Sequence, residues 1–452
     1  MDSDDPQTND PAATRYGWRV VFVLLLVYVY AFVDRTLLAL LIDPVRKSLH
    51  LSDTQISLLL GMAFAVFYCL CGLPAGYLAD RWDRRRLIGA GSVGWSLMTI
   101  LCGTAGTAGQ LLVGRMGVGI AESVISPTCL SLIRDAVPRQ SRALAYSVYG
   151  MGAPVGVALS LVGGGFLIHA AEQQRFAGLP LIGALQPWQI TLIVTGLFGL
   201  PLSLLLFTVR EPRRHSGGVD PARGLGVGAA LLATARYLGT RRSVYGPLFA
   251  FATFAAMINF SALIWLPTAL SRHWHLPPAA IGTPLGTITF FSSTAGLAVG
   301  GWLMKRLLTH GRSVLPVGAT VVLVSGASIA AAFLVPDLTL SYAALVPHLF
   351  VTGVSFAVAA TVLSEVTPAA MMGQVGAMFL SVQNIIGQSV GPLLVPALSD
   401  GLLGGPSALP GALGLTIVGY AVLAVISIVW LERSLGRVRL SADPAVRLAP
   451  QG

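Results

Sequence analysis

Long apolar runs alternate with short polar segments along almost the whole chain. Each run contains few or no charged residues, and each is about twenty residues or longer, the length that an α-helix needs to cross a membrane. Charged residues, Pro or Gly separate twelve such runs. The pattern predicts membrane spans at residues 18–42, 55–79, 86–105, 109–133, 141–169, 187–208, 244–271, 281–304, 313–335, 340–364, 373–398 and 410–431.

Composition supports a membrane protein. Only 11% of the 452 residues are charged and 54% are hydrophobic, whereas a soluble protein has roughly 25% charged residues. We therefore predict an all-α membrane protein with twelve transmembrane helices. The longest polar interruption, 210–243, follows the sixth span, so it is the predicted cytoplasmic linker between two pseudo-symmetric six-helix bundles, 17–209 and 244–433. Residues 1–16 and 434–452 are expected to be disordered tails.

The basic residues indicate topology rather than nucleic-acid binding. The net charge is +10, but no basic patch interleaved with aromatic residues is evident. If the N-terminus is cytoplasmic, most of the 29 Lys and Arg residues lie in cytoplasmic segments. Only Arg46, Lys47, Arg175 and Arg272 lie in the segments on the opposite side. By the positive-inside rule, we predict a multi-pass protein of the inner membrane with both termini in the cytoplasm.

The polar segment between the second and third spans carries a motif, a glycine, then Asp-Arg four residues later, then an arginine cluster. The glycine permits close helix approach, and the arginines can bind an acidic partner. The segment looks like the signature loop of the major facilitator superfamily, so we predict a cytoplasmic gate here. The second half has Gly301 but Lys305 where an aspartate is expected, so no symmetric gate is predicted there. The predicted gate residues are Gly76, Asp80, Arg81, Asp83, Arg84, Arg85 and, as their acidic partner, Glu365.

The fifth span is rich in glycine around one proline. Gly152, Pro154 and Gly156 form a run that resembles the glycine-proline motif in helix 5 of many exporters of the superfamily. Glycines allow close helix packing, and a proline permits a bend. The alternative interpretation is tight packing with no bearing on the direction of transport.

Four ionisable residues lie at membrane depth in the first half: Asp34 and Arg35 in the first span, and Arg115 and Glu122 in the fourth. Each costs a few kcal/mol at the bilayer centre unless it is paired or hydrated, so their presence predicts a polar cavity. Arg115, Gly119 and Glu122 fall on one helical stripe. We predict that Asp34 and Glu122 exchange protons and that an arginine binds an anionic group. A static salt-bridge network between the two helices is the alternative.

The spans of the second half contain polar but uncharged side chains. We selected Trp265, His348 and Asn384 as candidates for the other wall of the cavity. Each of them also fits a packing or helix-to-helix hydrogen-bonding role. His348 is an alternative proton site, because histidine titrates near neutral pH.

Three short segments are similar to bacterial members of the spinster family. They are Val33-Asp34-Arg35, Arg115 with Gly119 and Glu122, and Gly391-Pro392 followed by Leu398-Ser399-Asp400. The resemblance implies the major facilitator fold. Animal members of that family export lysolipids such as sphingosine 1-phosphate, and bacterial members look like proton-coupled transporters. The resemblance further implies that Asp34 and Glu122 respond to protons and that Arg35 is their partner or the anion contact.

No phosphate-binding loop and no catalytic or metal-ligating set is evident, so we expect neither an enzyme nor a resident cofactor or metal. An ion gradient is then the expected energy source. We predict a monomeric, proton-coupled transporter of amphipathic, anionic lipid-like molecules that works by alternating access in the lipid bilayer. Multidrug efflux by H+ antiport and symport of small organic anions are the alternatives within the class, and a receptor or scaffold is the alternative outside it.

Overall fold

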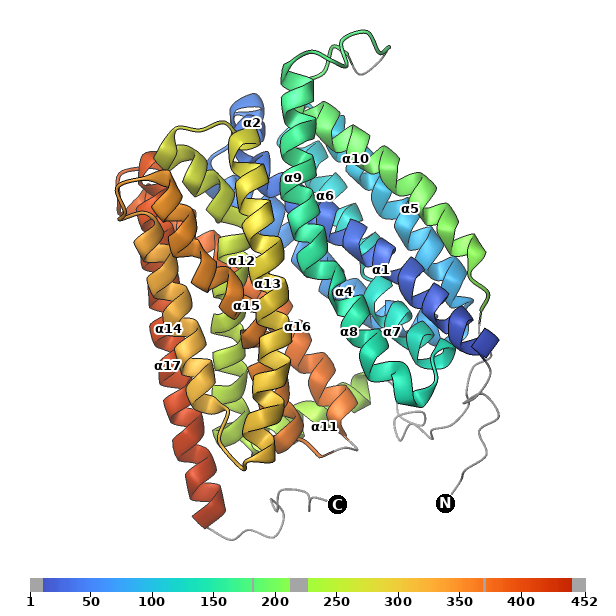
Figure 1. Cartoon of the computed structure of the whole chain (residues 1–452), viewed down its shortest axis with the longest axis vertical. Coiled ribbons are helices and arrows are strands. Elements are labelled where there is room, and N and C mark those ends of the chain that lie inside the picture. The colour runs from blue at the N-terminus through green and yellow to red at the C-terminus, as the bar shows by residue number, and fades with distance from the viewer. Residues whose placement is uncertain (1–10, 181–182, 212–226, 369–370, 441–452) are drawn as a thin grey trace. The chain divides into compact units, whose positions relative to one another are not determined.

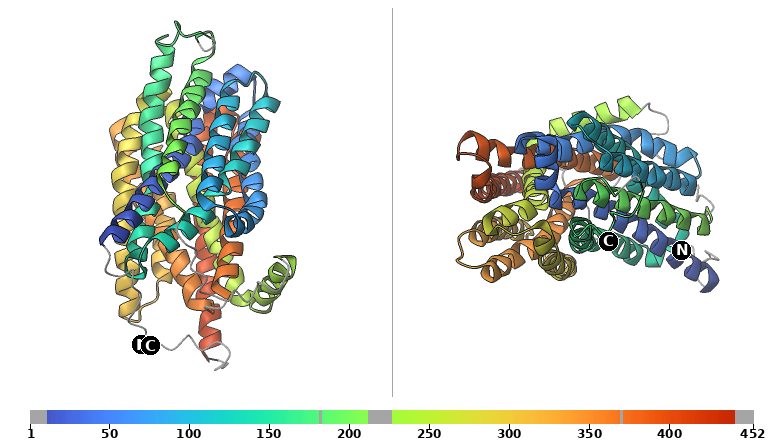
Figure 2. Two further views of the ribbon diagram at one scale, coloured as in Figure 1. Left: turned by 90° about the vertical axis from the view of Figure 1, so that its right-hand side faces the viewer. Right: turned by 90° about the horizontal axis from the view of Figure 1, so that it is seen from above.

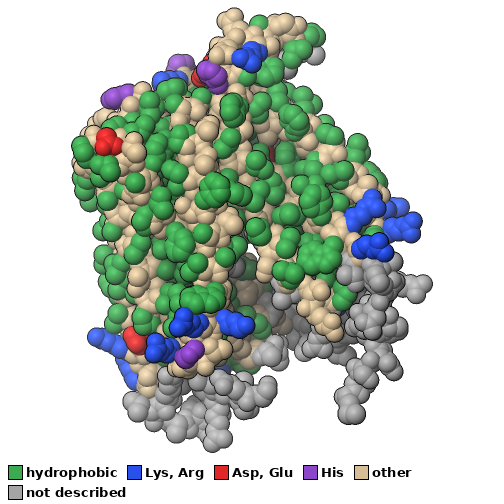
Figure 3. Space-filling view, in the orientation of Figure 1, with side chains coloured by type: hydrophobic (Ala, Val, Ile, Leu, Met, Phe, Trp, Pro, Cys, Tyr) green, Lys and Arg blue, Asp and Glu red, His purple; other side chains and the backbone are tan. Residues whose placement is uncertain are grey.

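The computed structural model describes residues 11–180, 183–211, 227–368 and 371–440, and within these ranges the chain is helical, with turns and short connections (Figure 1). Within these described ranges, eleven helical stretches are long and apolar enough to cross a membrane. The remaining predicted span, 86–105, corresponds to the helix Arg84–Gly103. This helix starts with three arginines and contains several Gly and Ser residues, which make it less apolar. Hydrophobic side chains cover the visible sides of the helices, and Lys and Arg gather near helix ends (Figure 3). Twelve transmembrane helices are thereby confirmed.

The first six spans comprise several helical pieces. They are α1 Pro11–Leu40, α2 Ile42–Leu49, α3 Asp53–Ser57, the π-helix η1 Leu58–Met62, α4 Ala63–Arg81, α5 Arg84–Gly103, α6 Ala108–Glu122, α7 Ile125–Ala136, α8 Arg142–Gly150, α9 Gly152–Glu172 and α10 Pro187–Leu204, extended by the 3-10 turn η3 Leu205–Thr208. The linker helix is α11 Val227–Thr240. The second half follows it and comprises α12 Arg242–Trp274, α13 Pro278–Thr309, α14 Leu315–Ala332, α15 Leu338–Val366, α16 Met372–Gly401 and α17 Leu409–Leu440.

Several boundaries differ from the sequence prediction. α1 begins at Pro11, inside the predicted N-terminal tail, and α17 continues to Leu440, beyond the predicted end of the second bundle. The fourth and fifth spans, predicted as continuous helices, are each divided in two. Pro127 lies four residues after Ser123 and Pro154 lies four residues after Gly150, so each proline removes one backbone hydrogen bond at the break.

The described part of the chain separates into two compact units. Unit 1 comprises the described residues up to 211 together with 275–290, and unit 2 comprises the described residues from 227 to 274 and from 291 to 440. In unit 1, α1 packs along α9, and α5 packs against α6 and α10. The beginning of α13 belongs to unit 1 because it packs closely on α9, where a Cβ atom added at Gly282 would lie 2.3 Å from the carbonyl oxygen of Leu161.

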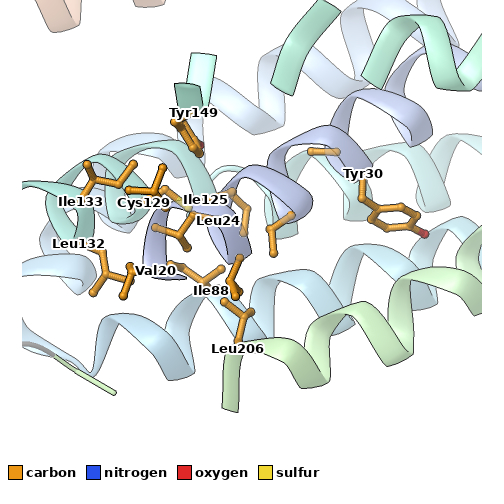
Figure 4. Packing of buried hydrophobic residues seen from close by; sticks show 14 of the residues in the cluster. Val20, Leu24, Tyr30, Ile88, Ile125, Cys129, Leu132, Ile133, Tyr149 and Leu206 are labelled. Atoms are coloured by element: carbon orange, nitrogen blue, oxygen red, sulfur yellow. The ribbon is translucent and has the colours of Figure 1, made fainter. Parts of the chain in front are cut away.

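A cluster of buried apolar side chains fills the interior of unit 1. Val20 and Leu24 of α1 pack with residues of α5, α7, α8 and η3 (Figure 4). The labelled members from those elements are Ile88, Ile125, Cys129, Leu132, Ile133, Tyr149 and Leu206. This core holds one end of α1 against the neighbouring helices. It thereby fixes where the residues further along α1 lie.

In unit 2, α12 packs against α16 and α17, and α14 packs against α15 and α17. The linker helix α11 is set at an angle to the long helices of this unit (Figure 2). The Thr234 hydroxyl of α11 donates a hydrogen bond to the Gln374 side chain near the start of α16.

Candidate functional site

The four ionisable residues predicted at membrane depth come together inside unit 1. Asp34 and Arg35 lie on α1, and Arg115 and Glu122 lie on α6. Asp34 and Arg115 are each 2% exposed and Glu122 is 4% exposed. The predicted stripe of Arg115, Gly119 and Glu122 is buried along its whole length, so α6 directs this face into the protein.

The closest contact in this cluster is an ion pair between the Arg35 guanidinium and the Glu122 carboxylate. Gly119 makes this contact possible, because it brings the backbone of α6 against that of α4. A Cβ atom at Gly119 would lie 2.6 Å from the Phe64 carbonyl oxygen. The π-helix η1 ends just before Phe64, and such segments are frequent near functional sites.

Aromatic rings surround the Arg35 guanidinium. Its Cζ atom lies 5.2 Å from the ring centroid of Phe32, 4.6 Å from that of Phe64 and 5.2 Å from that of Tyr68. Phe64 is shared, since the Arg115 Cζ atom lies 5.3 Å from the same centroid. Cation–π contacts of this kind stabilise a guanidinium that has left water. The rings also keep water away from the Arg35–Glu122 pair, which strengthens the attraction between the two charges.

Asp34 has a different environment from Glu122. One of its carboxylate oxygens accepts a hydrogen bond of 2.7 Å from the Thr99 hydroxyl of α5. Its other oxygen, Oδ2, and the Nε atom of Arg115 are buried and have no hydrogen-bond partner among the described residues. Asp34 therefore keeps an acceptor that a proton, a water molecule or a ligand can satisfy, and Arg115 keeps a donor that a water molecule or a ligand can satisfy.

Chemically, the cluster combines two carboxylates with two guanidinium groups, so it is neutral when all four are ionised. A buried ion pair depends on both partners, and removing the charge of one leaves the other uncompensated. A proton on either carboxylate therefore gives the cluster one net positive charge in a poorly hydrated place. The arrangement suits the binding of an anion together with a proton.

The predicted cytoplasmic gate contains a second buried ionic cluster. Arg84, which is 1% exposed, donates a hydrogen bond of 2.6 Å to Asp135 of α7 and one of 2.7 Å to Glu211 after η3. It also donates hydrogen bonds to the hydroxyl and the carbonyl oxygen of Ser131. Arg85 bonds the Val209 carbonyl oxygen through its side chain. Arg84 and Arg85 thus tie the start of α5 to the ends of α7 and η3.

The other predicted gate residues have separate positions. Asp83 caps α5 by accepting a hydrogen bond from the Arg86 backbone N–H, and Arg81 is exposed at the end of α4. Gly76 and Asp80 lie in α4, but the side chain of Asp80 falls outside the described set. Glu365 is exposed near the end of α15 in unit 2.

The helix-5 motif packs α9 against α1. A Cβ atom at Gly156 would lie 2.4 Å from the Val29 carbonyl oxygen, and one at Gly152 would lie 2.8 Å from the Tyr28 ring. Pro154 lies in the first turn of α9, after the break at Met151. The motif therefore sets the close approach of α9 to α1, the helix that carries Asp34 and Arg35.

The three candidates of the second half occupy separate places in unit 2. Trp265 is fully buried, and its indole N–H donates a hydrogen bond of 2.8 Å to the Pro392 carbonyl oxygen. Asn384 is half-buried, and its side-chain amide donates a hydrogen bond to the Leu380 carbonyl oxygen of its own helix. His348 is 2% exposed, and its Nδ1 atom lies 2.6 Å from the Ser325 hydroxyl of α14.

Sequence reasoning missed two groups of residues. Asp135 and Glu211, the partners of Arg84, follow the fourth and sixth spans. Their only signal in the sequence was that an acidic residue stands among arginines of the polar segments. Phe32, Phe64 and Tyr68 around Arg35 gave no signal, because aromatic residues in apolar spans are common packing residues.

Comparisons with known proteins show the family to which the chain belongs. Residues 24–392 match the family model of the Major Facilitator Superfamily. The chain is 28% identical over 440 residues to an MFS-type efflux pump of Mycolicibacterium smegmatis, and the match covers 94% of each chain. It is 25% identical over 345 residues to a probable L-galactonate transporter of Escherichia coli, covering 72% of this chain and 70% of the relative. A crystal structure of a bacterial homologue of the human lysosomal transporter spinster superposes with a TM-score of 0.75 at 25% identity, covering 96% of this chain and 99% of the other.

The fold, the buried ionic cluster and these relatives define a membrane transporter rather than an enzyme. The chain belongs to the major facilitator superfamily, and its fold is similar to that of the bacterial spinster homologue.

Proposed function

We propose that the chain is a proton-coupled transporter of amphipathic, anionic lipid-like molecules, such as lysolipids or molecules resembling sphingosine 1-phosphate. The observation that carries the proposal is the buried Arg35–Glu122 pair within its aromatic surroundings. Ionisable groups at membrane depth are expensive and mark transport pathways. The spinster-type fold supports the lipid-like substrate.

In this proposal, Glu122 and the substrate compete for Arg35. When Glu122 is ionised, it occupies the guanidinium. A proton on Glu122 removes its negative charge, and Arg35 is then available to bind a phosphate or carboxylate group through two parallel hydrogen bonds. Asp34 and Arg115 provide a second acid and base in the same cluster. Proton and anion therefore bind together, and we expect them to move in the same direction.

The proposal also includes the orientation of the chain in the membrane. We propose that the chain lies in the inner membrane with both termini in the cytoplasm. Arg84 and Arg85, tied to the ends of α7 and η3, support a cytoplasmic gate, and we retain Asp80 and Glu365 as further parts of it.

Uptake of radiolabelled lysophosphatidate into proteoliposomes tests the proposal. We expect uptake to increase when the outside is made more acidic than the inside. Glu122→Gln and Asp34→Asn should abolish this response, because an amide cannot exchange the proton. Glu172→Gln, an exposed carboxylate at the end of α9, is the control and should respond like the parent. If the two cluster variants retain the response to the gradient, the coupling mechanism is wrong.

Multidrug efflux is a second candidate, favoured by the relative from Mycolicibacterium smegmatis that is described as an efflux pump. It predicts that substrate and proton move in opposite directions and that the chain protects an efflux-deficient host from several hydrophobic drugs. A drug-susceptibility panel measures this directly.

Symport of a small organic anion is a third candidate, favoured by the relative described as a probable L-galactonate transporter. It predicts direct ligand contact by Arg35. Arg35→Lys should then ruin affinity while keeping the charge, because a lysine cannot provide the planar pair of donors.

A further inference from the structure

The end of α13 carries basic residues that belong neither to the ionic cluster nor to the predicted gate. Lys305 and Arg306 lie in its last turns, His310 and Arg312 follow directly, and all four are exposed. Lys and Arg side chains, with a histidine among them, gather at the end of unit 2 where α13 and α14 are joined (Figure 3). Lys305 stands four residues after a glycine, where the matching motif of the first half has Asp80. The second motif therefore has the opposite charge at this position.

The basic residues of the two motifs also differ in their partners. In the first half, Arg84 forms ion pairs with two carboxylates inside the protein. Among the residues that the structure describes, no carboxylate forms an ion pair with Lys305, Arg306 or Arg312. The helix dipole places roughly half a negative charge at the end of α13, which is too little to neutralise three cations. The end of α13 therefore keeps a positive charge that suits an anion from outside the protein.

A tight turn holds Arg312 at the end of α13. Gly311 has a φ of 62°, a left-handed conformation that glycine adopts readily. The Arg312 backbone N–H donates to the Leu307 carbonyl oxygen at 2.9 Å, and that of Gly311 donates to the Leu308 carbonyl oxygen at 3.0 Å. These two bonds form a Schellman motif, which turns the chain back at the end of a helix. The basic residues before and after the turn therefore stay at the same end of α13.

Trp302 indicates the depth of this site in the membrane. It is 56% exposed, and the Arg306 Cζ atom lies 5.2 Å from the centroid of its ring. α13 has 32 residues, which make about 48 Å of helix, so about 9 Å extend beyond each side of a hydrocarbon core of about 30 Å. Trp302 lies about 10 Å before the last residue, Thr309. Its ring is therefore at the boundary of the core, where tryptophan is enriched, and Lys305 and Arg306 are at the depth of the lipid headgroups.

We propose that the end of α13 binds the headgroup phosphate of an anionic membrane phospholipid. Lys305, Arg306 and Arg312 surround the phosphate, whose oxygens accept their hydrogen bonds. The Trp302 ring contacts the adjoining part of the acyl chains. This contact favours a lipid over a soluble anion, because only a lipid brings apolar groups to the exposed ring. The site is independent of the transported molecule, since it shares no residue with the ionic cluster of α1 and α6.

Quenching of tryptophan fluorescence by brominated lipids tests this site. The purified full-length protein is reconstituted in phosphatidylcholine vesicles with a minor fraction of either brominated phosphatidylglycerol, which is anionic, or brominated phosphatidylcholine, which is zwitterionic. The Trp302 signal is the difference between the parent protein and Trp302→Phe. Three exposed charge pairs, each worth about a factor of two, predict a roughly eight-fold preference of the Trp302 site for phosphatidylglycerol. High salt should lower this preference, because exposed charges are screened.

Substitutions of the cations identify the groups that bind the phosphate, and each variant is measured with and without Trp302→Phe. Replacing Lys305, Arg306 and Arg312 together by Gln should lower the preference to about unity. Lys305→Gln alone removes an exposed side chain and should lower it by about a factor of two. Arg306→Lys keeps the charge and should retain most of the preference. Arg437→Gln, an exposed arginine near the end of α17 in the same unit, is the matched control and should retain all of it.

Three results would overturn the inference. The first is equal quenching of Trp302 by the two brominated lipids in the parent protein at low salt. The second is a preference that survives in the triple variant. The third is loss of the preference when millimolar glycerol phosphate is added at constant ionic strength, which would assign the site to a soluble anion instead of a lipid. None of these results depends on which molecule the protein transports.

Discussion

Replacing Arg84 by methionine tests whether the buried ionic cluster around Arg84 stabilises unit 1. The Arg84 side chain is 2% exposed, and that of its partner Asp135 is 3% exposed. Methionine has a similar length but no charge, so the variant removes the buried partner of Asp135. It leaves Asp135 paired with Arg134, whose side chain is 57% exposed and whose Nε atom lies 3.2 Å from the carboxylate. Breaking a buried pair in this way costs about 3 to 5 kcal/mol. For a unit of roughly 150 to 250 residues, each kcal/mol lowers the melting temperature by about 2 to 4 °C.

The expected result for Arg84→Met is therefore a melting temperature about 6 to 20 °C below that of the parent. Thermal unfolding of the detergent-solubilised protein, followed by intrinsic tryptophan fluorescence, measures it. Arg86→Met is the matched control, because the Arg86 side chain is 75% exposed and lies 3.9 Å from Asp83. Such an exposed pair contributes about 1 kcal/mol or less.

A second substitution identifies the cause of the loss. Asp135→Asn in the Arg84→Met background removes the negative charge that has lost its buried partner, so it should restore part of the melting temperature. Equal melting temperatures for Arg84→Met and Arg86→Met would refute the reasoning, because burial would then make no difference to the pair.

Two further predictions concern helix packing. Gly156→Ala should lower both the melting temperature and transport, because its Cβ atom would lie 2.4 Å from the Val29 carbonyl oxygen. The control, Gly163→Ala on the same helix, meets nothing within 4 Å and should be neutral. Equal melting temperatures for the two variants would contradict the close packing of α9 on α1. Trp265→Phe should cost about 1 kcal/mol, because it removes the hydrogen bond to Pro392, and an unchanged melting temperature would show that this bond contributes nothing to unit 2.

The sequence was sufficient to predict the helices and the ionic cluster. Long apolar runs determine the spans because a helix must cross the bilayer, and charged residues inside those runs are conspicuous. The stripe of Arg115, Gly119 and Glu122 follows directly from helical periodicity, and the structure buries it as expected.

Contacts between distant segments were beyond this reasoning. The Arg84 side chain meets Asp135 and Glu211, which lie 51 and 127 residues further along the chain. Membrane helices are apolar on nearly every side, so periodicity does not say which face meets which neighbour. The division of the fourth and fifth spans followed from Pro127 and Pro154, but a proline in a membrane helix also fits a continuous, bent helix.

The central claim is that proton binding at Glu122 and anion binding at Arg35 are linked. The most direct measurement is proton movement driven by substrate alone, followed with a pH-sensitive dye inside proteoliposomes that start with no pH gradient. Addition of lysophosphatidate outside should acidify the interior of liposomes with the parent protein. It should produce no pH change with Glu122→Gln. Alkalinisation by the parent protein, or equal acidification by the variant, would contradict the account.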